Sequence, residues 1–173
     1  MSTFNNCRRL LCLLTILPLQ LQAHSPGPGL GQPIVENGQA SAILIDGTGL
    51  HAGRGDVASG EVLFNQHCMS CHGIEGQGGS NDRLTGGHGS LTTTAPVKTI
   101  GSYWPYATTL FDYIGRAMPY NSPGVLSADE VYSITAYLLY LNGILSLDAS
   151  IDRHSLPKVM MPNRNGFDTA HPL

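Results

Sequence analysis

A C-x-x-C-H motif, Cys68-Met69-Ser70-Cys71-His72, constrains this chain more than any other feature of its sequence. This spacing is the attachment sequence for c-type heme. The two thiols lie three positions apart, so each can form a thioether with one vinyl group of the porphyrin. The adjacent imidazole is then held beneath the iron as proximal ligand. We therefore predict one covalent heme c, attached through Cys68 and Cys71 and ligated by His72.

The first 23 residues have the pattern of a secretory signal peptide. Arg8 and Arg9 form the charged region, an apolar run continues to Leu21, and Ala23 supplies a small residue at the cleavage site. The apolar run of about 12 residues is too short to cross about 30 Å of hydrocarbon. We therefore expect export of the chain rather than a transmembrane anchor.

Two other kinds of site use closely spaced cysteines. A thioredoxin-like motif opens a helix, whose N-terminus lowers the thiol pKa, whereas this motif closes a predicted helix. A structural zinc site needs two further ligands. The other cysteines, Cys7 and Cys12, belong to the segment that is expected to be removed. Both alternatives are therefore weaker than heme attachment.

The composition agrees with a small, loop-rich domain built around a cofactor. Among 173 residues there are 21 Gly and 11 Pro, and aromatic residues make up only 7%. A large conventional core is not expected. The two cysteines that remain after export, Cys68 and Cys71, are too few and too close together to stabilise the domain through disulfides. The nine Lys and Arg are scattered and the net charge is −3. Nucleic-acid binding through a basic surface is therefore excluded as a leading function.

Three helices are predicted around the motif. The first covers 57–67 with Asp56 as N-cap. The last follows the capping box of Ser127 and Glu130, presents an apolar stripe at 131, 134, 138 and 141, and ends before Gly143. A middle helix begins at 108 or 109 and ends at 117, because Pro119 stops it.

The first and last helices are expected to cross closely. Gly60 lies inside the first helix, where Gly costs about 1 kcal/mol relative to Ala. A second helix packed against Gly60 would give a reason for that cost, with the ring of Tyr137 lying over it. The alternative is that Tyr137 is an ordinary core aromatic.

The distal iron ligand is predicted to be Met118. The candidates are Met118, Met160, Met161, His88, His154 and His171. Met118 lies in the loop before the last helix, and Pro119 fixes the backbone beside it. A thioether ligand raises the heme potential relative to two histidines. Because it also closes the iron to small ligands, outer-sphere electron transfer is the expected activity.

These elements resemble a class I cytochrome c, and longer stretches resemble a more specific family. The stretches are KTIGSYWPYATTLFDYI at 98–114, RAMP at 116–119, PGVLSADEVY at 123–132, AYLLYLN at 136–142, SLPKV at 155–159 and MPNR at 161–164. They are similar to the monoheme cytochrome subunit of sulfite and sulfane dehydrogenases in the bacterial sulfur-oxidation (Sox) pathway. DGTGL at 46–50 also fits, although His51 follows where the family usually has Pro. The resemblance covers about residues 42–168.

The resemblance implies an all-α, class I cytochrome c fold, with three to four helices around a covalent heme. The expected organisation is a signal peptide at 1–23, an extended N-terminal arm at 24–55, the cytochrome domain at 56–145 and a C-terminal arm at 146–173. The residues that match the family's heme attachment and iron-ligand positions are Cys68, Cys71, His72 and Met118. We further expect Trp104, Arg83 and Lys98, and with them Tyr103, to contact the heme propionates. The loop from 73 to 107 is expected to wrap one heme edge.

The resemblance also implies a partner and a location. The partner is a molybdopterin-containing catalytic subunit that oxidises sulfite or protein-bound sulfane sulfur in the periplasm. The chain would accept electrons one at a time and pass them to a downstream cytochrome c or oxidase, with no catalytic residue of its own. Two alternatives stay open: a free-standing electron shuttle, and an open-site heme enzyme or sensor. The C-terminal arm is expected to lie along the catalytic subunit.

Overall fold

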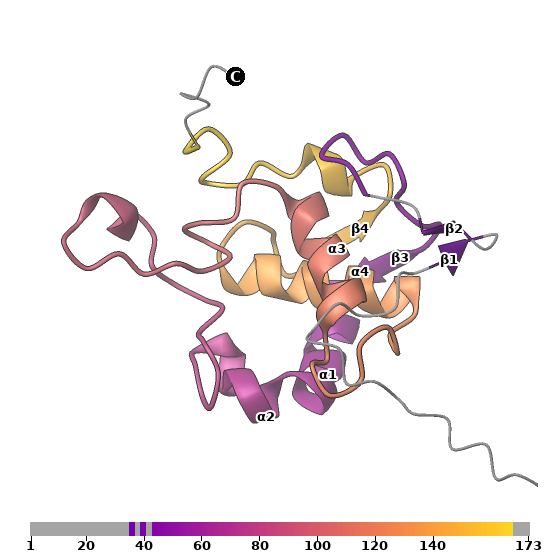
Figure 1. Ribbon diagram of the computed structural model, residues 1–173, viewed down its shortest axis with the longest axis horizontal. Helices are drawn as coiled ribbons and strands as arrows, with labels where there is room; N and C mark the ends of the chain where they lie inside the picture. The colour runs from indigo at the N-terminus through magenta and orange to yellow at the C-terminus, as the bar shows by residue number, and fades with distance from the viewer. Residues whose placement is uncertain (1–34, 37–38, 41–42, 168–173) are drawn as a thin grey trace, which may run out of the picture.

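The computed structural model describes residues 35–36, 39–40 and 43–167 (Figure 1). The predicted signal peptide and most of the predicted N-terminal arm lie outside these residues. The α-helices are α1 (Val57–His67), α2 (Met69–His72), α3 (Ala107–Ala117) and α4 (Ala128–Leu141). The 3-10 turns are η1 (Ile74–Gly76), η2 (Ser90–Thr92) and η3 (Leu156–Lys158). The strands are β1 (Val35–Glu36), β2 (Gln39–Ala40), β3 (Arg54–Asp56) and β4 (Ser150–Asp152). In this part of the chain no helix is long and apolar enough to cross a membrane.

Helix α1 begins and ends where the sequence predicts. The side chain of Asp56 accepts a hydrogen bond from the backbone N–H of Ser59 (2.8 Å), which satisfies one of the free donors of the first turn. Cys68 is the C-cap of α1, and its N–H donates to the carbonyl of Phe64. The rest of the motif forms the single turn α2. The prediction that the motif closes a helix is therefore confirmed.

Helix α4 is the central element of the fold. Its capping box is complete: the side chain of Ser127 accepts from the N–H of Glu130, and the carboxylate of Glu130 accepts from the N–H of Ser127. Residues 131–139 are all buried, so α4 has more than the single apolar stripe that was predicted. The reason is that α1, α3 and the β3–β4 pair all contact it (Figure 1).

Helices α1 and α4 cross closely at Gly60, as predicted. A Cβ at Gly60 would overlap the carbonyl oxygen of Ser133 and would lie 2.7 Å from Cβ of Tyr137. The ring of Tyr137 packs on Phe64, with centroids 5.5 Å apart. Gly60 is therefore required by contact with the α4 backbone as well as with Tyr137. Its helix-propensity cost is offset by close packing.

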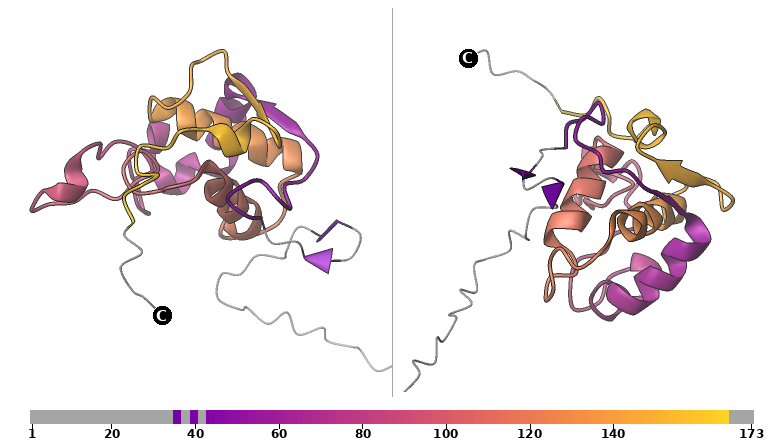
Figure 2. Two further views of the ribbon diagram at one scale, coloured as in Figure 1. Left: turned by 90° about the horizontal axis from the view of Figure 1, so that it is seen from above. Right: turned by 90° about the vertical axis from the view of Figure 1, so that its right-hand side faces the viewer.

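Strand β4 packs on α4, and the turn η3 that follows it packs on α3. Strands β3 and β4 pair antiparallel, with Gly55 opposite Ile151. Ile151 and three later side chains of the same segment, Leu156, Val159 and Met161, are buried in the core. The described part of the C-terminal arm, 146–167, therefore packs on the cytochrome-like core. Figure 2 shows this segment lying along the helices in both views.

Helix α3 begins at Ala107, one or two residues before the predicted start, and ends at Ala117 as predicted. The long loop between α2 and α3 has two parts. Its outer part, around η2, projects from the rest of the molecule, as Figures 1 and 2 show. Its neck is closed by hydrogen bonds, including one from Thr99 Oγ1 to the Gly86 carbonyl (2.5 Å). Only the stretches on either side of this neck lie near the helices.

Candidate functional site

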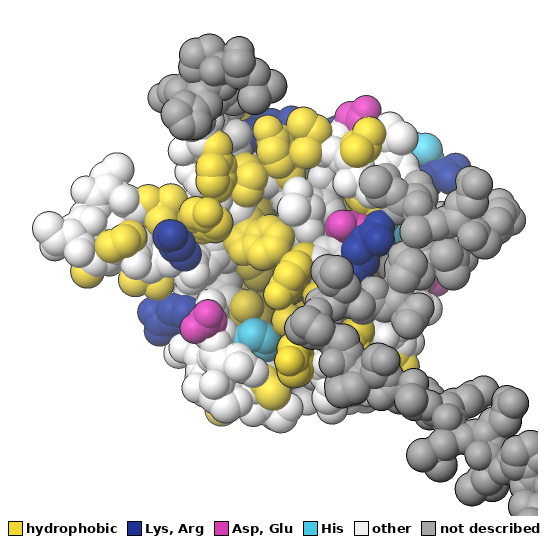
Figure 3. Space-filling model, viewed as in Figure 1, with side chains coloured by type: hydrophobic (Ala, Val, Ile, Leu, Met, Phe, Trp, Pro, Cys, Tyr) yellow, Lys and Arg dark blue, Asp and Glu magenta, His cyan; other side chains and the backbone are white. Residues whose placement is uncertain are grey.

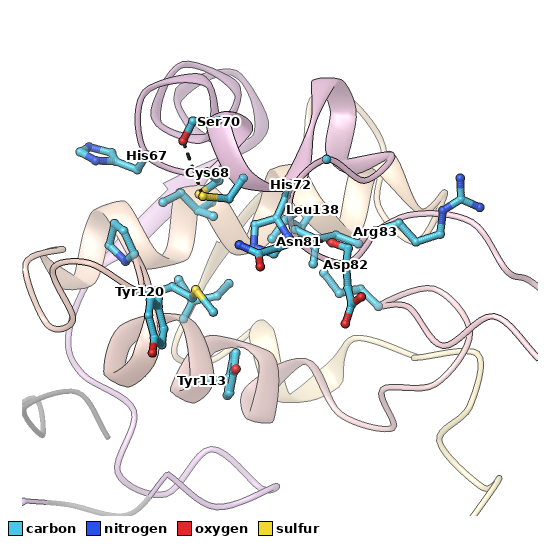
Figure 4. A pocket seen from close by; sticks show the side chains of 18 of the residues that line it. His67, Cys68, Ser70, His72, Asn81, Asp82, Arg83, Tyr113, Tyr120 and Leu138 are labelled. Carbon is cyan, nitrogen blue, oxygen red and sulfur yellow. Dashed lines mark hydrogen bonds between the residues drawn. The ribbon is translucent and has the colours of Figure 1, made fainter. Parts of the chain in front are cut away.

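A cavity of about 1030 Å³ lies between the α1–α2 corner and helix α3. This volume is at the upper end of the range for cofactor and small-molecule sites. Its inner wall is apolar and comes from α3 and α4: Leu110, Ile114, Ile134 and Leu138. Figure 4 shows His72 on one side of the cavity and Tyr113 on the opposite, α3 side. The cavity is therefore formed by elements far apart in the sequence.

Both cysteines of the motif line this cavity. Cys68 and Cys71 are not bonded to each other and are partly buried. Burial, with Cys71 as a smaller contribution, raises the pKa of the Cys68 thiol to about 11. A thioredoxin-like cysteine has a lowered pKa instead. The surroundings of Cys68 therefore disfavour the redox alternative.

His72 is oriented by a backbone carbonyl. Its Nδ1 lies 2.8 Å from the carbonyl oxygen of Asp82. A carbonyl oxygen only accepts hydrogen bonds, so Nδ1 must carry the proton and donate it. The lone pair of a neutral imidazole is then on Nε2, the atom available to a metal. This is the arrangement that a metal-ligating histidine needs.

Met118 reaches the same cavity from the other side. It is the C-cap of α3, and its N–H donates to the carbonyl of Ile114 (3.1 Å). None of the other candidate ligands among the described residues lines the cavity: Met160, Met161, His88 and His154. Met160 is 71% exposed, whereas Met161 is 3% exposed and belongs to the core under the C-terminal segment. The remaining candidate, His171, lies outside the described residues.

Of the four side chains that were expected to contact propionates, Trp104, Arg83 and Lys98 line the cavity, whereas Tyr103 does not. Arg83 donates to the carbonyl of Gln77 (3.4 Å), and in Figure 4 its guanidinium points away from the cavity. The ammonium of Lys98 lies 5.0 Å from the ring centroid of Tyr103. The ring of Trp104 packs edge-on against Tyr113, with centroids 5.6 Å apart. The structure thus brings these three residues to the lining of the cavity, and Trp104 is the least exposed of them.

Several cavity residues were not singled out from the sequence. Asp82 acts through its backbone carbonyl, so its side chain carries no signal for the role. Tyr113 and Tyr120 stand at the cavity rim, and both are exposed. Both tyrosines lie within five residues of Met118 in the sequence, and this closeness to a predicted ligand could have marked them as cavity residues.

The residues present fit a covalently attached heme. Two thiols, an imidazole with Nε2 available and a thioether surround an apolar cavity. No group of three or more His, Cys, Asp or Glu side chains that could hold a metal occurs within 43–167 or the short described strands before it. The donor set of this cavity therefore suits an iron porphyrin better than a bare metal ion.

Comparison with known proteins adds independent information. A family model described as cytochrome c matches residues 57–142. Among solved structures, a chain in the crystal structure of the sulfane dehydrogenase SoxCD from Paracoccus pantotrophus is 45% identical, with a TM-score of 0.75. The match covers 84% of this chain and 73% of that chain. Comparison with curated protein sequences gives no match.

Proposed function

The chain belongs to the class I cytochromes c of the Sox type, and on this premise we propose that it is the electron-accepting subunit of a periplasmic sulfur-compound dehydrogenase. As a cytochrome c it is an electron carrier with covalently bound heme c. The proposal adds one heme, a molybdopterin-containing catalytic partner and a downstream cytochrome c or oxidase. It also assigns the predicted signal peptide to periplasmic export.

The observation that carries the proposal is the 45% identity to a chain of SoxCD, extending over 84% of this chain. The match extends beyond the residues of the cytochrome c model, which are 57–142. A generic soluble cytochrome would need to share only the heme-binding part. Similarity outside that part supports a shared assembly.

We assign the heme-binding roles to four residues. Cys68 and Cys71 would form the thioethers, and His72, through Nε2, and Met118 would be the iron ligands. When bound, the heme supplies a one-electron redox couple. The apolar inner wall of the cavity would exclude water. Met118 would occupy the coordination position that a small ligand such as carbon monoxide needs. Trp104 and Lys98 would provide donors for the propionates at the cavity edge, and Arg83 would do so once its guanidinium turned toward the cavity.

The direction of electron flow follows from the chemistry of the partner. Oxidation of sulfite or of sulfane sulfur by the catalytic subunit releases two electrons per turnover. With one heme, the chain would take the two electrons in successive steps. Each would pass to the downstream cytochrome c or oxidase before the next is accepted.

The surface of the chain supports a protein partner. Figure 3 shows a face on which apolar side chains gather in a band, with charged side chains mainly to its sides. Charged residues make up only 12% of the sequence. Depletion of charge is typical of the centre of protein–protein interfaces. We place part of the contact on the C-terminal segment, where Leu147 and Met160 are exposed.

Affinity purification from the native periplasm, followed by molybdenum analysis, tests the proposal. We expect a molybdenum-containing protein to co-purify with the heme protein. Leu147→Ser and Met160→Ser together should weaken this complex and leave the heme spectrum unchanged. Val62→Ser, at another exposed apolar residue, is the matched control. Recovery of the cytochrome alone would favour a free-standing shuttle.

A further inference from the structure

A buried amide joins the end of α4 to the loop beside the cavity. Asn142 is the C-cap of α4, and it is 4% exposed. Its Nδ2 donates to the carbonyl oxygens of Leu138 (2.8 Å) and Leu84 (3.2 Å). Its Oδ1 accepts from the N–H of Gly86 (3.2 Å). Two of these hydrogen bonds therefore link α4 to the loop.

The returning side of the loop leaves room for the same amide. A Cβ at Gly101 would overlap Oδ1 of Asn142. The N–H of Ile100 donates to the Leu84 carbonyl (3.2 Å), which also accepts from Asn142. Leu84 and Ile100 both line the cavity. The outgoing and returning stretches of the loop are thus joined to each other and to α4 at one point.

We propose that Asn142 is a positioning residue for the proximal ligand His72, an inference that rests on the proposed heme-binding function. The connection is short. Asn142 holds Leu84, and two residues earlier the carbonyl of Asp82 accepts the hydrogen bond from His72 Nδ1 (2.8 Å). The N–H of Leu84 also donates to the carbonyl of Gly76 (2.7 Å), so the acceptor segment is fixed from both sides.

The chemistry of the position favours an amide. The surrounding backbone presents two carbonyl acceptors and one N–H donor, and a primary amide satisfies all three. An apolar side chain would take the acceptor from the Gly86 N–H and one donor from each of the two carbonyls, and the loss of such hydrogen bonds is costly where the groups are buried. They would then turn toward water, and the loop would open locally. The carbonyl of Asp82 would move with it.

Hydrogen exchange in the ferrous holoprotein, followed by NMR, tests the proposal. The variant is Asn142→Leu, and the matched control is Thr135→Val. Thr135 is buried in the same helix and donates to the carbonyl of Val131 (2.6 Å), but it does not line the cavity. Both changes remove a buried hydrogen bond of α4. Only the first should act on His72.

We expect Asn142→Leu to speed exchange of the His72 Nδ1 proton and the Leu84 amide at least about tenfold more than exchange of the Phe64 amide in α1. Thr135→Val should speed all three by one common factor. Gly101→Ala, whose added Cβ would push aside the Asn142 amide and the His88 ring with no substitution in α4, should reproduce the pattern of Asn142→Leu.

Equal acceleration at all three sites in both the Asn142 and Gly101 variants would overturn the role of Asn142. Absence of heme absorption bands from the wild-type protein would instead overturn the proposed function. The two failures are therefore distinguishable.

Discussion

At the scale of single residues, the site depends on how His72 and Met118 are held. His72 is oriented by the Asp82 carbonyl, and Met118 is placed by the end of α3. The motif predicted the position of His72 because its spacing is fixed by chemistry. Asp82 was not predictable, since a backbone acceptor leaves no trace in residue type. Met118 was favoured over the other candidates by Pro119 and by its place before the last helix.

Met118→Ala should open the distal side of the iron. We expect the reduced protein to bind carbon monoxide readily and the heme potential to fall, because the thioether ligand that raises it is lost. Absorption spectra with and without carbon monoxide, together with a redox titration, measure both effects.

Met160→Ala is the control, since Met160 is exposed and does not line the cavity. A wild-type spectrum in the Met118 variant would assign the distal ligand to another residue. Ready carbon monoxide binding by the wild-type protein would favour the open-site alternative.

At the scale of elements, the helices that carry strong local signals were predicted well. Asp56 and the Ser127–Glu130 capping box marked helix starts to the residue. Strands β3 and β4 were not predicted, because each has three residues and its partner is far away in the chain. The burial of every residue from 131 to 139 was missed for the same reason. Local periodicity does not show that several distant segments pack on different faces of one helix.

Gly60→Ala should destabilise the α1–α4 crossing. The added Cβ would overlap the Ser133 backbone, and overpacking of this kind costs about 1–3 kcal/mol. The gain in helix propensity, about 1 kcal/mol, would offset only part of it. Urea unfolding of the holoprotein measures the change.

Glu61→Ala, at an exposed position of the same helix, should change the free energy of unfolding by less than about 0.5 kcal/mol. Equal stability of the Gly60 variant and the wild type would mean that the helices do not cross as closely as described.

The capping box predicts an acid dependence of stability. Hydrogen bonds from the backbone and side chain of Ser127 hold the pKa of Glu130 below its ordinary value of 4.5. A lowered pKa in the folded state means that the carboxylate stabilises the protein above pH 4.5. This contribution is lost as the pH falls through the folded-state pKa.

Glu130→Gln should therefore be less stable than the wild type at pH 7, and the difference should shrink below pH 4.5. Unfolding curves of both proteins across this range provide the measurement. If the difference in free energy of unfolding stays constant with pH, the ionised carboxylate of Glu130 does not stabilise the N-terminus of α4.

At the scale of the whole molecule, the C-terminal segment has a structural role beside the proposed docking role. It was expected as an arm along the partner, yet its described part also buries Leu156 and Met161 against the core. Truncation after Asp148 would remove both and would disturb folding as well as docking. Exposed substitutions such as Met160→Ser are for this reason the better probe of the partner.

Leu156→Ala should cost about 2–5 kcal/mol, because it leaves a cavity where a fully buried side chain was. Lys158→Ala, in the same turn but exposed, should cost less than about 0.5 kcal/mol. Urea unfolding of the two variants compares them. Similar small effects would show that the segment is not part of the folded core.

The central claim is that the chain accepts electrons from a sulfur-oxidising molybdenum partner. Its most direct test is the absorption spectrum of the oxidised cytochrome, recorded without oxygen after sulfite or a sulfane-bearing protein is added. The account predicts heme reduction when the co-purified partner is present and none in its absence. A heme that stays oxidised with the molybdenum protein and either substrate present would contradict it.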